Sequence, residues 1–124
     1  MRSVILITAS QTAAEDIYLQ WKEEGKHIGF EPNQKGGDLG MELRGKSIYV
    51  WGAGDSTAGG YENDELRHVD ILHPYFYIIR YADREVMKYF IEKTKFPEDS
   101  YMDNDDERII PVEEVRKDIL GFIE

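Results

Sequence analysis

Two segments far apart in the chain are apolar on both sides of an extended strand. Residues 4–8 read Val-Ile-Leu-Ile-Thr, and residues 75–81 read Tyr-Phe-Tyr-Ile-Ile-Arg-Tyr. Because successive side chains of a strand point to opposite faces of a sheet, a strand that is apolar on both faces is covered on both. Both segments are therefore expected at the centre of one sheet.

Apolar residues at helical spacing predict three helices around this sheet. The first covers residues 12–24, where Thr12 and Glu15 have the spacing of a capping box. The second begins after Asp83 as its N-cap. The third begins at Pro111, which suits a first helical position.

Shorter segments complete the predicted order, which is β-α-β-β-β-α-(β)-α. Residues 27–31, 47–51 and 109–110 read as strands. The glycine-rich stretch 32–46 reads as a loop or an irregular hairpin, and residues 52–60 read as a second, flexible loop. This order predicts an α+β fold in a single small domain over residues 1–124. Its mostly antiparallel sheet has four to five strands, with two or three helices packed on one face.

Composition narrows the function classes. The chain has 15 Lys and Arg against 25 Asp and Glu, a formal net charge of −10, which argues against binding nucleic-acid phosphates or anionic lipid. It contains no cysteine, so thiolate metal sites and cysteine nucleophiles are excluded. The apolar run near the start, about five residues, is too short for a signal-peptide core or a membrane span. A cytoplasmic protein without a cofactor is expected.

The densest charge lies in one acidic run near the C-terminal end. Six carboxylates fall within ten residues, with an aromatic and a methionine side chain among them. Complementary charge speeds the encounter with a basic protein, and interspersed apolar side chains supply anchors. The predicted partner-binding residues are Glu98, Asp99, Tyr101, Met102, Asp103, Asp105, Asp106 and Glu107.

The acidic run has two other interpretations. A run of like charges is commonly a solvated loop that keeps a protein soluble. Asp103, Asp105 and Glu107 also alternate like the first ligands of a calcium loop. Arg108, however, stands where that loop needs its turn glycine, and Glu114 at the twelfth position falls inside a predicted helix. No metal site is therefore predicted.

Residues 40–47 match the phosphate-loop pattern G-x-x-x-x-G-K-S. That pattern binds phosphate only where a strand precedes it and a helix follows it. Here residues 48–51 favour a strand, and Glu42 would repel an anion. Nucleotide hydrolysis is therefore not predicted.

A second function class is binding or sequestering a small, nucleotide-like molecule. Residues 54–60 have a loose likeness to a nucleophile turn, but Ala58 replaces its last glycine. Glycine-rich loops do allow a backbone to approach a ligand closely. The residues of this alternative site come from the loops 32–46 and 52–60: Lys35, Arg44, Lys46, Asp55, Ser56, Thr57 and Tyr61.

A third class is an enzyme with acid–base groups among His68, Asp70 and His73. If residues 68–72 are a strand, the first two share a face and His73 points away, so the three do not converge. Half-buried or surface histidines near a turn are the simpler interpretation, and no catalytic residue is predicted.

The hypothesis favoured by size and charge is a non-enzymatic binding protein that neutralises a basic protein partner. Its concrete form is an immunity protein or inhibitor of a bacterial toxin nuclease, or a phage-type inhibitor that mimics DNA. A nuclease binds phosphates in a basic cleft, and an inhibitor can fill that cleft with carboxylates. A homodimer formed through exposed aromatic strand faces is left open as an alternative contact.

Overall fold

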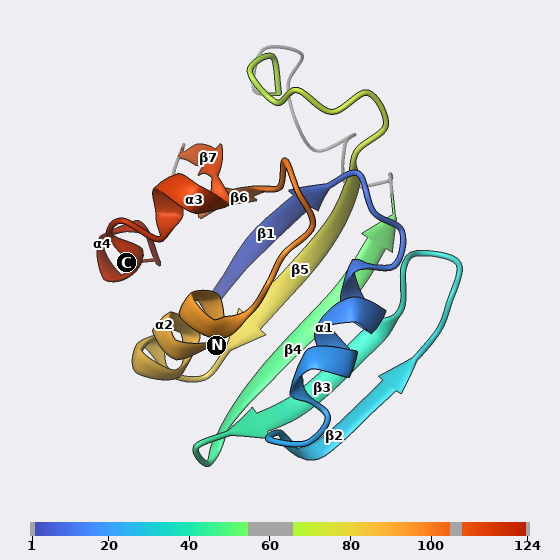
Figure 1. The fold of residues 1–124 in the computed structure, drawn as a ribbon, viewed down its shortest axis with the longest axis vertical. Coiled ribbons are helices and arrows are strands. Elements are labelled where there is room, and N and C mark those ends of the chain that lie inside the picture. The colour runs from blue at the N-terminus through green and yellow to red at the C-terminus, as the bar shows by residue number, and fades with distance from the viewer. Residues whose placement is uncertain (1, 55–65, 105–107, 124) are drawn as a thin grey trace.

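The computed structural model describes residues 2–54, 66–104 and 108–123, and its strands form one antiparallel sheet (Figure 1). The sheet has seven strands in the order β2-β3-β4-β5-β1-β6-β7. The α+β class is confirmed, and the predicted count of four to five strands is wrong. The strands are β1 (Arg2–Thr8), β2 (Lys26–Glu31), β3 (Asp38–Leu43), β4 (Lys46–Gly54), β5 (Tyr75–Tyr81), β6 (Tyr101–Asp103) and β7 (Ile109–Pro111).

The two doubly apolar segments are β1 and β5, and they pair with each other near the middle of the sheet. Ile5 is opposite Ile78, and Leu6 is opposite Tyr77. β4 covers the other side of β5, and β6 covers the other side of β1. The predicted central position of both strands is confirmed.

The helices pack on one face of this sheet. α1 (Ala13–Trp21) lies against β2, β3 and β4, and α2 (Arg84–Lys93) lies against β5 (Figure 1). The two short helices α3 (Val112–Val115) and α4 (Ile119–Ile123) replace the single last helix that was predicted, and they join the same core. No helix in the described ranges is long and apolar enough to cross a membrane.

The two long helices begin in different ways. The Asp83 carboxylate accepts a hydrogen bond from the Val86 N–H at 3.2 Å, as predicted for an N-cap. Thr12 caps nothing, because its hydroxyl pairs with the Ser10 hydroxyl at 3.2 Å. The predicted capping box at Thr12 and Glu15 is therefore wrong. The Thr12 hydroxyl forms its hydrogen bond with Ser10, in the loop before α1, and not with the helix backbone.

The phosphate-loop pattern forms the hairpin between β3 and β4. Gly40 lies within β3, and Arg44 and Gly45 turn the chain with positive φ angles of 51° and 77°. Two successive positive φ values are the conformation of a tight hairpin turn, which explains the glycine. Lys46 and Ser47 then open β4. The rejection of a phosphate site is consistent with this. Of the two interpretations of residues 32–46, the hairpin fits the pairing of β3 with β4, and the loop does not. The loop expected from residue 52 is wrong at residues 52–54, which belong to β4.

Cross-strand pairing divides the side chains of the sheet between two faces. One row, on the helix-covered face, runs Leu39, Val50, Ile79 and Val4, and all four are buried. The neighbouring row points away from the helices and runs Glu31, Asp38, Trp51, Ile78 and Ile5. We call this second side the open face.

Candidate functional site

The acidic run does not form one surface, because part of it is strand β6. Met102 points to the core and is fully buried, whereas Tyr101 and Asp103 point to the open face. Asp103 is only 6% exposed. The expectation of a water-facing patch through these residues is therefore wrong for Met102 as an anchor and for Asp103 as a free charge. Asp105, Asp106 and Glu107 lie outside the described residues.

Glu98 and Asp99 remain exposed, on the helix side of the molecule. They line a cavity of about 470 Å³ between the segment after α2 and helix α3. Arg116 is also in its wall, but its guanidinium is paired with Glu113 and bonded to the Thr94 carbonyl. The residues of the cavity are Lys95, Phe96, Pro97, Glu98, Asp99, Ser100, Pro111, Val112, Glu113 and Arg116.

The chain's own cations leave several carboxylates unpaired. Glu42, Glu92, Glu113 and Glu114 form salt bridges. Within the part of the chain that the structure describes, Glu31, Asp38, Glu98 and Asp99 form none. All 15 Lys and Arg lie in that part with 17 of the 25 acidic residues. The other eight are Asp55, Glu62, Asp64, Glu65, Asp105, Asp106, Glu107 and Glu124.

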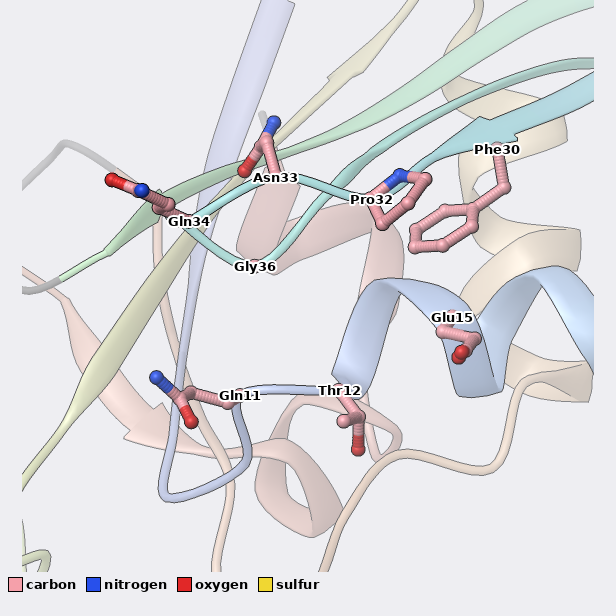
Figure 2. Close-up of a pocket in the computed structure, with 8 residues that line it drawn as sticks. All are labelled: Gln11, Thr12, Glu15, Phe30, Pro32, Asn33, Gln34 and Gly36. Carbon is pink, nitrogen blue, oxygen red and sulfur yellow. The ribbon is translucent and has the colours of Figure 1, made fainter.

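A second cavity, of about 280 Å³, lies between the start of α1 and the turn that joins β2 to β3 (Figure 2). The Asn33 side-chain oxygen builds this turn, because it accepts hydrogen bonds from the Lys35 and Gly37 N–H groups at 2.8 and 3.0 Å. Cavities that enclose ligands measure roughly 300–1,000 Å³, so this one is small for a nucleotide. Its walls are Gln11, Thr12, Glu15, Phe30, Pro32, Asn33, Gln34 and Gly36.

Tyr77 fixes the two walls of this second cavity relative to each other. Its hydroxyl donates to the Ser10 carbonyl at 2.8 Å, just before α1. Its ring lies so close to Gly36 that a Cβ there would be 2.8 Å from the hydroxyl oxygen. Burial raises the pKa of Tyr77 to about 12, so the phenol stays a proton donor at neutral pH.

The basic residues of the predicted small-molecule site do not come together. Lys35 lies beside Gly54, whose N–H donates to the Lys35 carbonyl at 3.0 Å. Lys46 begins β4, about 25 Å from that end at roughly 3.3 Å per residue. Arg44 adjoins Lys46, and its guanidinium lies 3.8 Å from the centre of the Tyr89 ring. The remaining members, Asp55, Ser56, Thr57 and Tyr61, lie outside the described residues.

The histidine group is held by structural contacts. The His68 Nε2 donates to the Ile109 carbonyl of β7 at 2.6 Å, and its ring meets Tyr101 edge-on. The Asp70 N–H donates to the Tyr101 hydroxyl at 3.4 Å. Among the described residues, no three histidine or acidic side chains lie close enough to hold a metal ion. His68 and Asp70 thus fasten the segment before β5 to β6 and β7.

The sequence interpretation missed the open face as a site. Tyr49, Trp51, Ile78 and Arg80 are all half-buried there, in the central strands β4 and β5. The Tyr49 and Trp51 ring centres are 5.5 Å apart, and the Arg80 guanidinium lies 5.5 Å from the Trp51 ring centre. The sequence does place Tyr49 and Trp51 on one side of the strand predicted at residues 47–51 and Ile48 and Val50 on the other. A single strand, however, cannot show which of its two sides the helices cover.

Comparisons with protein-family models, with curated protein sequences and with solved structures found no match to this chain.

Proposed function

We propose that this protein is a non-enzymatic binding protein that neutralises a basic protein partner. The observation that carries the proposal is that many exposed carboxylates form no salt bridge within the described residues, Glu31, Asp38, Glu98 and Asp99 among them. A chain with a net charge of −10 attracts a cationic partner over several ångströms and repels an anionic one. Charge complementarity of this kind raises association rates and rejects wrong partners.

The form of this proposal that we favour is an immunity protein or inhibitor of a bacterial toxin nuclease. A nuclease needs a basic cleft to hold the phosphates of its substrate. Carboxylates placed in that cleft exclude the substrate without any chemical step. Such an inhibitor acts in the cytoplasm, where the nuclease would otherwise reach nucleic acid. A phage-type inhibitor that mimics DNA charge is a variant of the same mechanism.

The test begins with tagged protein used to capture partners from its source cells at low salt. We expect a basic protein whose nuclease activity the purified chain inhibits at equimolar concentration. The association rate should fall several-fold between 50 and 200 mM salt, because screening shortens the reach of the attraction.

A matched pair of variants locates the charge effect. E98Q/D99N removes two unpaired charges, and Asn suits the positive φ of 60° at position 99. E113Q/E114Q removes two charges that already pair with Arg116 and Lys117. The first pair should slow association more than the second. An acidic partner, or an association rate indifferent to salt, would contradict the proposal.

A further inference from the structure

The centre of the open face is apolar and aromatic, and the described helices pack with the core of the opposite face. One end of the open face, at Ile7 and Phe76, is fully buried, so its partly exposed area lies around Trp51, Ile78 and Ile5. Trp51 is opposite Ile78, and Ile78 is opposite Ile5, so three large side chains form one continuous row across β4, β5 and β1. All three are half-buried. The neighbouring row places Tyr49 opposite Arg80.

The aromatic side chains lie flat along the sheet. Tyr49 is opposite Gly40, where an added Cβ would be 3.2 Å from the tyrosine ring. The ring therefore occupies the space that a side chain on β3 would take. Arg80 lies over the Trp51 ring and is held there by a cation–π contact. Tryptophan, tyrosine and arginine are the side chains that dominate binding energy at protein interfaces.

The charges at the border of this row are carboxylates. Glu31 and Asp38 are directly opposite each other on β2 and β3, next to Trp51. Like charges that face each other across two strands destabilise a sheet. Neither forms a salt bridge among the described residues. Arg80 and Lys26, which lie on this face, already have neighbours, since Arg80 lies over Trp51 and Lys26 is opposite Glu42.

We propose that the open face is the docking surface for a basic protein, with Trp51 and Tyr49 as its anchors and Glu31 and Asp38 as its ion-pair partners. A cation from the partner would relieve the repulsion between these two carboxylates while the aromatic rings are covered. This inference rests on the proposed function and adds the location of the contact.

A cationic occupant fits this face better than a second copy of the chain. Two copies would each bring a net charge of −10, and that repulsion opposes association. A second copy would also bring Glu31 and Asp38 as further carboxylates. A basic protein instead supplies the charge that this border lacks.

The test uses the basic protein isolated with the chain from its source cells, purified and titrated against variants. Trp51→Ala should weaken binding at least about thirtyfold, as expected for the loss of a central aromatic anchor. Asp38→Lys should weaken it about tenfold, chiefly through a slower association rate. The control is Leu19→Ala, an apolar truncation at a position of α1 that is 52% exposed, and it should change binding less than twofold.

Asp38 is exposed, so Asp38→Lys keeps the test decisive if Trp51→Ala fails to fold. If the basic protein binds both variants as tightly as the native chain, the docking surface is elsewhere and the proposed function still stands. If no basic protein is bound and inhibited, the proposed function fails and this inference fails with it. If light scattering shows a dimer that Trp51→Ala dissociates, the open face is a contact between two copies and the inference is wrong.

Discussion

The two faces of the central strands have similar apolar content, but at the middle of the sheet their surroundings differ. In β5, Ile79 is fully buried under the helices, while its neighbour Ile78 is half-buried on the open face. In β4, Val50 is fully buried and Trp51 is half-buried. The helix-covered face holds most of the core. The open face leaves Trp51 and Ile78 partly exposed, although Ile7 and Phe76 at one end of the same face are fully buried. This partly exposed apolar area is the physical basis of the docking surface proposed above.

The largest predicted effect is a difference in the free energy of unfolding between alanine variants of the two faces. Ile79→Ala should lower the free energy of unfolding by about 4 kcal/mol, because it leaves a cavity in a closed core. Ile78→Ala should lower it by about 1 kcal/mol, because its site is open to water. Both residues lie in the same central strand, so the loss of strand propensity from Ile to Ala is the same in the two variants and does not affect their difference. Urea unfolding of the two variants measures the difference.

Equal losses for Ile78→Ala and Ile79→Ala would break the comparison. That result would mean that something closes the open face in solution. Repeating the measurement over a tenfold range of protein concentration would then distinguish a second copy from the chain itself.

The next effect is a dependence of stability on pH that comes from Tyr77, on the helix-covered face. Burial raises the pKa of Tyr77 to about 12, against about 10 in an unfolded chain. Above pH 10 the unfolded chain releases a proton that the folded chain keeps, so stability falls as the pH rises towards 12. The loss should reach about 2 kcal/mol. Unfolding in urea at pH 9, 10 and 11 should show this fall.

Tyr77→Phe is the control for that pH dependence. Below pH 10 the variant should be about 1 kcal/mol less stable than the native chain, since the hydrogen bond to Ser10 is gone. Above pH 10 most of the fall should disappear, so this difference should shrink. Burial also raises the pKa of Tyr81, so a smaller fall should remain. An unchanged slope in Tyr77→Phe would mean that other groups cause it.

The smallest predicted effect concerns the helices that make the covered face. Asp83→Ala removes the capping hydrogen bond of α2 and should cost about 1 kcal/mol. Thr12→Ala is the matched control at α1, where no side-chain cap exists, and should cost under about 0.5 kcal/mol. Thermal unfolding gives both values. Binding through the open face should be the same in both variants, and a change there would show that the two faces are coupled.

The sequence predicted the central strands well and the outer ones poorly. β5 is where its residues indicated, because a run that is apolar on both faces suits only a covered strand. β3 was missed because glycines usually mark loops. Gly36, Gly37 and Gly45 do adopt positive φ in turns, whereas Gly40 lies within the strand and makes room for Tyr49. Nothing local distinguishes these two uses of glycine.

The sequence could not predict where the exposed carboxylates lie on the folded chain. The acidic run was identified as one surface because its charges are consecutive in sequence. Strand β6 runs through it, so the alternation of side chains buries Met102 and sends Asp103 to the opposite side from the core. The carboxylates that border Trp51 come from β2 and β3, about 70 residues earlier in the chain than the run. Only the register of four strands brings Glu31, Asp38, Trp51 and Ile78 into one row.

The position of β1 has a consequence for how the chain is made. β1 is synthesised before the other strands of the sheet, yet its two neighbours in the sheet are β5 and β6. The strand Val-Ile-Leu-Ile must therefore wait, without a partner on either side, until residues 75–81 and then 101–103 have been synthesised. The β2-β3-β4 meander joins neighbours in sequence and can form during that delay. Early termination of translation would thus release a chain whose apolar strand β1 is unpaired on both edges. Such fragments should aggregate rather than fold.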